Sequence, residues 1–281
     1  MLLDAASVWS KAWPILFAIL FFGVIILIHE LGHFTVAKLS GIKVNEFAIG
    51  MGPKLLSFGK GETKYSLRLI PMGGYVQMEG EDEASEDERA FNQKPVWKRF
   101  LVVIAGAVMN IILGLVLVAI LLTQQNLIGT TQIAGFHENA SSQSSGLQEG
   151  DVITHINGTS VWSDRDISFL MARDRDGVID FTVKRDGQKT ELKNVKFDTR
   201  EVDGQTVITF DFIIIGENKT FWNVLKTSFL ETASMARLVW LSLFDLVTGR
   251  FGLSDLAGPV GTVSVIAEAT TSGGFLNALS L

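Results

Sequence analysis

The chain has 281 residues, 47% of them hydrophobic, and its mean hydropathy of +0.31 is too high for an average soluble domain. A protein made only of membrane-spanning helices would be more apolar, so we expect spanning segments together with water-exposed domains. The formal net charge of −6 argues against a nucleic acid partner. The absence of cysteine excludes disulfides and thiolate ligands, so any metal must be held by His, Asp or Glu.

Two apolar segments are long enough to cross a bilayer. The first begins at Trp13 and continues to Leu39. No small-residue cleavage site follows it, so we interpret residues 1–37 as a retained transmembrane helix rather than a signal peptide. The second segment contains Asn110 as its only strongly polar residue and predicts a transmembrane helix over residues 100–123.

The first apolar segment contains the motif His29-Glu30-Leu31-Gly32-His33. Ionisable residues at this depth are costly and usually functional. Residues four apart on a helix are turned by only about 40°, so His29 and His33 can hold one divalent metal ion. Glu30 lies on the adjoining face, where it can act as the catalytic base toward a water molecule. The alternative, histidines satisfied by helix–helix hydrogen bonds, leaves three buried polar side chains without a shared partner.

A catalytic zinc site needs a third protein ligand. The first two apolar segments contain no further acid. Asp245, Asp255 and Glu268 are later candidates, but each is explained more simply as an interfacial or loop charge. The third ligand is therefore left unassigned.

Lysine and arginine are distributed unevenly around the two spans. Lys38, Lys43, Lys94, Lys98 and Arg99 lie close to the bilayer in the loop between them, whereas residues 123–156 contain no Lys or Arg. By the positive-inside rule, residues 38–99 are cytoplasmic and the following domain is extracytoplasmic.

Glycine and proline divide residues 42–78 into several predicted short strands, with a clear turn at Pro71-Met72-Gly73-Gly74. Residues 79–88 are densely acidic and predict a solvated loop.

The pattern of residues 128–200 is that of a soluble α/β domain. A strand ends in an Asn157-Gly158 turn, and two more strands, 179–184 and 189–195, are joined by Asp186-Gly187. We expect a connecting strand segment over residues 201–220. Residues 221–248 predict an amphipathic helix that becomes a third transmembrane span, and residues 249–281 a loop and the start of a fourth helix.

Taken in order, these motifs resemble the site-2 protease family of intramembrane zinc metalloproteases, in its bacterial form with a single PDZ domain. The resemblance covers nearly the whole chain. It rests on the zinc-binding helix at 29–33, the loop motifs at 50–55 and 68–76, the second-helix motif Gly106-x-x-x-Asn110, and Gly258-Pro259-Val260-Gly261.

The resemblance implies a polytopic α-helical protein of the cell membrane, with a membrane-associated β-hairpin region and one extracytoplasmic α/β PDZ domain. It also implies one zinc ion held by His29 and His33, with Glu30 as base, within the membrane toward the cytoplasmic side. The implied substrates are single-pass membrane proteins already trimmed by another protease, such as anti-sigma factors or signal-peptide remnants. The PDZ domain is expected to bind a peptide or free C-terminus, or else to act as a spacer.

The sequence allows two interpretations for each of two features, the hairpin edges and Asn110. The hairpin edges either pair with an unwound substrate strand or belong to an ordinary interfacial loop. Asn110 either binds the substrate backbone near the metal or forms, with Gly106 and Gly114, a small-residue stripe suited to close helix packing.

One departure from the family bears on activity. The family's third zinc ligand is an aspartate in a Leu-Asp-Gly motif on a helix that follows an Asn-x-x-Pro stretch, and no such motif occurs in this chain. Residues 275–281 resemble the approach to that helix, so we expect a C-terminally truncated chain that binds zinc poorly alone. The alternative functions are a membrane-anchored PDZ scaffold or an inactive protease fragment. A metal transporter is weaker, because it gives Glu30 no role.

Overall fold

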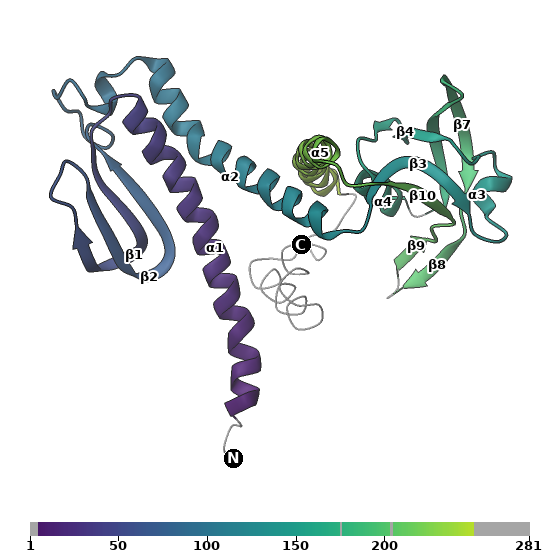
Figure 1. The fold of residues 1–281 in the computed structure, drawn as a ribbon, viewed down its shortest axis with the longest axis horizontal. Helices are drawn as coiled ribbons and strands as arrows, with labels where there is room; N and C mark the ends of the chain where they lie inside the picture. The colour runs from purple at the N-terminus through teal and green to yellow at the C-terminus, as the bar shows by residue number, and fades with distance from the viewer. Residues whose placement is uncertain (1–4, 175, 203–204, 250–281) are drawn as a thin grey trace. The chain divides into compact units, whose positions relative to one another are not determined.

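The computed structural model describes residues 5–174, 176–202 and 205–249. Within these ranges the chain divides into two compact units, with the boundary near residue 118. The first unit contains a long helix, a β-hairpin and most of a second long helix (Figure 1). The second unit contains the α/β domain and a third long helix.

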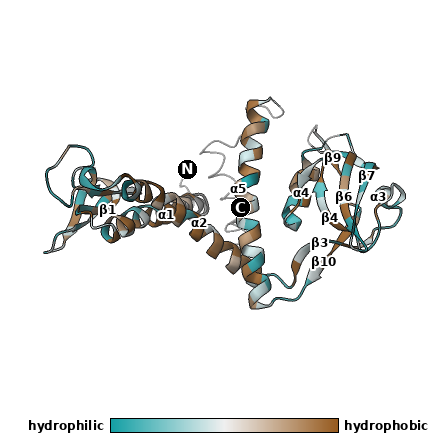
Figure 2. Ribbon diagram, turned by 90° about the horizontal axis from the view of Figure 1, so that it is seen from above, coloured by the Kyte–Doolittle hydropathy of each residue, from teal (hydrophilic) through white to brown (hydrophobic). Residues whose placement is uncertain are grey.

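The two long apolar helices are α1 (Ala5–Leu39) and α2 (Val96–Gln124), the latter preceded by a 3₁₀ turn, η1 (Phe91–Gln93). The apolar part of α1 has 25 residues with a mean hydropathy of 2.5, and α2 has 29 residues with 2.8. At about 1.5 Å per residue, each exceeds the roughly 30 Å hydrocarbon core of a bilayer. Both helices are hydrophobic along most of their length (Figure 2). In length and composition they match the two spans expected from the sequence.

The segment between these helices forms one long antiparallel hairpin, β1 (Val44–Phe58) and β2 (Lys64–Met78). The several short strands expected from the sequence are joined here into two long, bent strands, because the glycines shift the register and Phe47 of β1 pairs with both Val76 and Tyr65 of β2. Gly50, for example, has a φ of 83°, and a Cβ there would lie 2.5 Å from the carbonyl oxygen of Ile70. Only glycine permits this approach of the two strands.

One half of the hairpin packs against α1. The rings of Phe47 and Tyr65 lie 5.1 and 6.1 Å from the ring of Phe34 on that helix. Elsewhere the hairpin exposes between 48% and 65% of five apolar side chains: Leu55, Leu56, Phe58, Leu69 and Ile70. An apolar surface of this kind is typical of contact with lipid or another protein.

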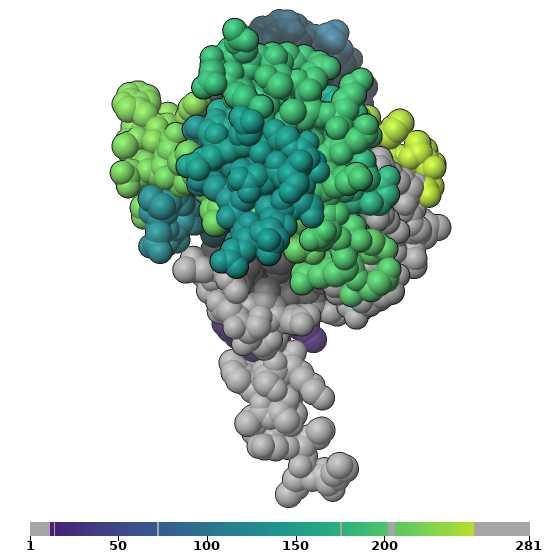
Figure 3. All heavy atoms as spheres, turned by 90° about the vertical axis from the view of Figure 1, so that its right-hand side faces the viewer, coloured from purple at the N-terminus to yellow at the C-terminus, as the bar shows by residue number. Residues whose placement is uncertain are grey.

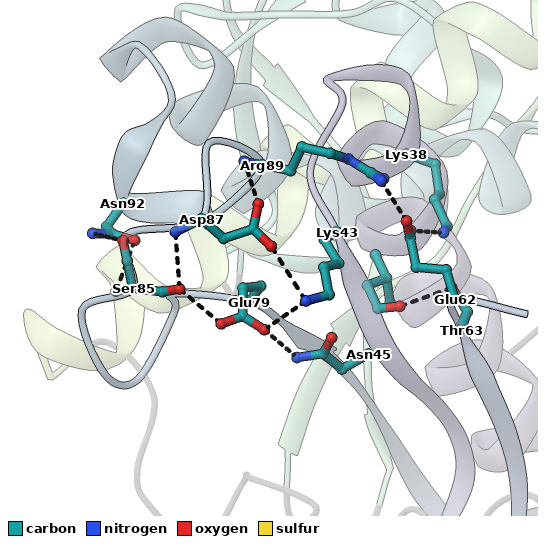
Figure 4. A network of polar contacts seen from close by, with 11 residues as sticks. Lys38, Lys43, Asn45, Glu62, Thr63, Glu79, Ser85, Asp87, Arg89 and Asn92 are labelled. Atoms are coloured by element: carbon teal, nitrogen blue, oxygen red, sulfur yellow. Dashed lines mark hydrogen bonds and ion pairs between the residues drawn. The ribbon is translucent and has the colours of Figure 1, made fainter.

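The acidic segment after β2, predicted as a solvated loop, is anchored near both ends by Lys43 (Figure 4). Lys43 lies 3.4 Å from Glu79 and 3.2 Å from Asp87. The pKa of Glu79 is lowered chiefly by a hydrogen bond from Asn45, and the pKa of Asp87 chiefly by one from the backbone N–H of Arg89. The acids between these two remain exposed.

The second unit is built on an antiparallel sheet with strand order β10-β3-β4-β6-β7, in which β5 also pairs with β4. Its elements are β3 (Ile128–Phe136), α3 (Ser141–Ser144), β4 (Val152–Ile156), β5 (Thr159–Ser160), α4 (Asp164–Ala172), β6 (Val178–Arg185), β7 (Gln188–Lys196), β8 (Thr199–Val202), β9 (Gln205–Ile208) and β10 (Phe212–Glu217). The strands and α4 enclose a buried apolar core around Phe181, and α3 packs against β7. Figure 3 shows the outer surface of this unit, in teal and green.

The predicted turns of this domain are confirmed. Asn157-Gly158 and Asp186-Gly187 both have two consecutive positive φ angles, as two-residue hairpin turns of the primed type require. The domain nevertheless extends past residue 200. β8 and β9 form a separate hairpin, and β10 joins the main sheet beside β3, within the segment expected to be only a connector. Among the strands described, β10 pairs only with β3, so its outer edge is open.

The third long helix, α5 (Phe221–Val247), begins at Thr220, whose hydroxyl accepts a hydrogen bond from the Asn223 N–H. Of the helices described, only α1 and α2 are apolar enough to cross a membrane. The buried residues of α5 are polar: Ser228, Glu231, Ser234 and Asp245. Several of these side chains pair with the α/β domain, and the third span expected over residues 221–248 stays a prediction.

Candidate active site

His29, Glu30 and His33 lie in the last part of α1, where this helix contacts α2. One helical turn separates the two histidines, so their rings face the same side. The ring centroids are 4.8 Å apart and the two Nε2 atoms are 3.1 Å apart. The structure therefore brings together the two nitrogen atoms that the sequence predicted as metal ligands.

The spacing of these nitrogens fits two ligands of one metal ion. Two nitrogens bound to a tetrahedral zinc ion at about 2.0–2.1 Å lie about 3.3 Å apart, close to the 3.1 Å that separates them here. Gly106 of α2 faces the pair, and a Cβ there would lie 2.5 Å from both Nε2 atoms. Glycine thus leaves space for an ion beside the two rings. No group of three or more His, Asp or Glu side chains in the described residues could complete a metal site.

α2 also holds both rings on the side away from this space. His33 Nδ1 lies 2.7 Å from the carbonyl oxygen of Val102. Since a carbonyl only accepts, Nδ1 carries the proton and Nε2 presents its lone pair. His29 Nδ1 lies 3.3 Å from Nδ2 of Asn110. Asn110 therefore contacts a predicted ligand, while its predicted contact with substrate stays a prediction.

The approach of α1 to α2 depends on Gly32, which the sequence analysis did not single out. A Cβ on Gly32 would lie 2.5 Å from the carbonyl oxygen of Ala105. The predicted small-residue stripe does not pack along its whole length. Gly106 faces the two histidines, but a Cβ on Gly114 would meet nothing within 4 Å. The signal for Gly32 was its position inside the motif, one residue before His33.

Glu30 and His33 line a cavity of about 340 Å³, together with Tyr75, Val76 and Val102. Glu81, which the sequence analysis assigned to the solvated loop, lines the same cavity. The backbone of β2 passes beside Glu30, because a Cβ on Gly74 would lie 3.2 Å from Cγ of Glu30. The cavity therefore brings a carboxylate, an imidazole and a strand backbone together.

Of the acids considered as third ligands, only Asp245 lies in the described part of the chain. Asp245 forms an ion pair of 2.6 Å with Arg173 in the second unit. Asp255 and Glu268 lie outside the described residues, as does the motif at 258–261.

Comparison with known proteins supports the interpretation of this site. The model of Peptidase family M50 matches residues 17–281. A protein of Clostridium acetobutylicum, named as a candidate zinc metalloprotease, is 41% identical over 260 residues, covering 92% of this chain and 76% of its own length. The regulator of sigma-W protease RasP of Bacillus subtilis is 27% identical, covering 91% of this chain and 80% of its own length. The zinc metalloprotease RasP of Bacillus licheniformis is 28% identical, covering 94% and 82%.

Proposed function

The chain belongs to peptidase family M50, and on that premise we propose that it is an intramembrane zinc endopeptidase that cleaves transmembrane segments of other membrane proteins. The observation that carries the proposal is the convergence of His29 and His33 on an apolar helix, with their Nε2 atoms 3.1 Å apart. The names of the relatives support zinc as the metal.

In this proposal His29 and His33 hold the ion and Glu30 is the general base. When bound, zinc lowers the pKa of water and polarises the peptide carbonyl. Glu30 takes the proton of the attacking water and delivers it to the leaving amine nitrogen. The position of Glu30 in the same cavity as His33 supports this division of roles.

The hairpin is proposed to hold the substrate backbone during cleavage. A transmembrane helix hides its carbonyl groups, and unwinding it in lipid leaves backbone groups unsatisfied unless the enzyme supplies partners. β2 passes beside Glu30, and among the strands described it pairs only with β1. An unwound segment can therefore add to the open edge of the hairpin.

The α/β domain is proposed to be an extracytoplasmic PDZ domain that binds a peptide or a free C-terminus. The open outer edge of β10 supports this role, because a PDZ domain binds its ligand as an added strand. Ile213 on that strand is 50% exposed and available to a ligand side chain. A domain that binds no peptide would instead act as a spacer.

The proposed substrates are single-pass membrane proteins already trimmed outside the cytoplasm, such as anti-sigma factors or signal-peptide remnants. The name of the Bacillus subtilis relative supports a regulatory substrate. The distribution of lysine and arginine supports an active site toward the cytoplasmic side of the cell membrane.

The proposal is tested with Glu30→Gln in the full chain, assayed against a membrane-anchored substrate. We expect cleavage to fall about 10²- to 10⁴-fold with unchanged zinc content, because only the base is lost. Glu86→Gln, which alters an exposed acid of the same unit, is the matched control and leaves cleavage unchanged. Cleavage by Glu30→Gln at the normal rate would exclude Glu30 as the base, and cleavage that survives complete removal of zinc would exclude a zinc enzyme.

A further inference from the structure

Asn110 is the only side chain of α2 that forms a hydrogen bond with a predicted metal ligand in the described structure. Its Nδ2 lies 3.3 Å from His29 Nδ1. Its other polar atom, Oδ1, is buried and has no hydrogen-bond partner among the described residues. A buried amide oxygen without a partner is costly, so this half of the amide calls for an explanation.

The hydrogen bonds around the two histidines form a continuous chain in which the donor and acceptor of each bond can be assigned. His33 Nδ1 donates to the carbonyl of Val102, so His33 Nε2 is an acceptor. His29 Nε2, 3.1 Å away, must then carry the proton between the rings, which leaves His29 Nδ1 as the acceptor for the amide of Asn110. With this order every hydrogen bond has one donor and one acceptor.

Metal binding requires the other tautomer of His29. A neutral histidine that coordinates through Nε2 has its proton on Nδ1, and Nδ1 becomes a donor. An NH₂ group cannot accept that hydrogen bond. Rotating the Asn110 amide by 180° exchanges its nitrogen and oxygen within nearly the same shape, so that Oδ1 accepts from His29 Nδ1. The rotation gives Oδ1 a hydrogen-bond partner and moves Nδ2 to the position that Oδ1 had.

We propose that Asn110 is a positioning residue for zinc, which fixes His29 in its metal-binding tautomer by accepting a hydrogen bond from Nδ1 through its amide oxygen. The tautomers of the two ligands are then fixed by different kinds of group. The fixed carbonyl of Val102 sets the tautomer of His33, whereas a side chain that can rotate sets the tautomer of His29. The inference rests on the proposed function, because it assumes that the two histidines hold zinc.

Three interpretations of Asn110 predict different zinc affinities for its Ala and Asp variants. A positioning role requires an acceptor, so Asn110→Asp retains zinc affinity and Asn110→Ala loses it. A packing role requires only a small side chain, so Asn110→Ala retains zinc affinity. A donor to the substrate backbone affects the Michaelis constant, so both variants bind zinc normally and both raise KM.

The experiment measures zinc affinity of the full chain by competition with a chromogenic chelator, in detergent and without substrate. We expect Asn110→Ala to weaken zinc binding about 10- to 100-fold, the usual cost of losing an outer hydrogen-bond partner of a ligand. Asn110→Asp should bind within about threefold of the unsubstituted chain or more tightly, because carboxylates are common partners of metal-bound histidine. Val108→Ala, which alters an exposed side chain of α2, is the matched control and leaves affinity unchanged.

A second measurement keeps the test decisive if Asn110→Asp does not fold. The absorption spectrum of Co²⁺ in the site reports ligand geometry, and Asn110→Ala should alter it while tryptophan fluorescence shows a folded chain. Equal zinc affinity of Asn110→Ala and the unsubstituted chain would overturn the inference, as would equal losses in the Ala and Asp variants when both are folded. If the unsubstituted sequence binds no zinc when measured in the complete protein, the proposed function fails rather than this inference.

Discussion

Arg173 and Asp245 form a two-point ion pair between the end of α4 and the end of α5. Arg173 Nε donates to Asp245 Oδ2 at 2.7 Å, and its Nη2 donates to Oδ1 at 2.6 Å. The Asp245 side chain is only 3% exposed. A buried carboxylate needs a paired charge, so this contact fixes the last turn of α5 against the α/β domain.

Other polar contacts follow the same two helices. Asp166 of α4 is fully buried and lies 3.0 Å from Arg237 of α5, and it also accepts a hydrogen bond from Ser234. Arg165 lies 3.0 Å from Glu231. The polar face of α5 is therefore occupied by the α/β domain along much of its length.

Arg173→Ala should destabilise the packing of α5 on the domain. The substitution removes both hydrogen bonds between Arg173 and Asp245, and losing one partner of a buried ion pair costs about 3–5 kcal/mol. We expect faster backbone hydrogen exchange across α5, measured by mass spectrometry of the full chain. The double variant Arg173→Met with Asp245→Leu should restore slow exchange, because replacing both members of a buried ion pair with apolar side chains is often neutral or stabilising.

The control for this prediction is Lys189→Ala, which breaks an exposed ion pair with Glu191. Exposed pairs contribute about 0–1 kcal/mol, so exchange across α5 should not change. If Arg173→Ala leaves α5 as protected as in the unsubstituted chain, the ion pair does not hold this helix in place.

The motif residues could be predicted because their arrangement is local. His29 and His33 are one helical turn apart, so their spacing follows from helix geometry once the helix itself is recognised. The turn at Asp186-Gly187 is local in the same sense, since the residue types set the sign of φ. Long, uniformly apolar segments likewise predicted α1 and α2.

The partners of these residues could not be predicted, because they lie far away in the sequence. Val102 is 69 residues from His33, and its contribution is a backbone oxygen that no sequence pattern marks. Asp245 was interpreted as an interfacial charge. It is buried because α5 packs against α4, where its partner Arg173 lies 72 residues away in the sequence. Whether a charge is solvated depends on the packing of elements, which the sequence alone does not specify.

Glu46 should make the hairpin sensitive to acid. Burial raises its pKa, but hydrogen bonds from Ser66, Lys54, Arg68 and Tyr75 outweigh this effect and lower the pKa from 4.5 to about 2. Because the folded pKa is below the unfolded value, the stabilisation is present above pH 4.5 and is lost as the pH falls from 4.5 toward 2. The shift corresponds to roughly 3 kcal/mol at neutral pH.

The measurement is the unfolding midpoint of the full chain between pH 2 and pH 7, for the unsubstituted chain and for Glu46→Gln. We expect Glu46→Gln to be less stable at pH 7 and to lack the part of the acid transition below about pH 4.5. Glu83→Gln removes an exposed acid and should leave the pH profile unchanged. A profile of Glu46→Gln that runs parallel to the unsubstituted chain over this range would contradict the prediction.

Gly106→Ala should abolish zinc binding without weakening the helix that carries it. The added Cβ would lie 2.5 Å from the Nε2 atoms of both His29 and His33, so it would fill the space beside the two nitrogens. Alanine is favoured over glycine inside a helix by about 0.5–1 kcal/mol, so α2 itself should gain stability. Gly114→Ala is the matched control on the same helix, because its Cβ would meet nothing within 4 Å.

We expect zinc content and cleavage to fall at least about tenfold for Gly106→Ala and to stay normal for Gly114→Ala. A more stable helix does not restore the space that the ion needs. Full zinc occupancy in a folded Gly106→Ala chain would place the metal elsewhere than between these two imidazoles.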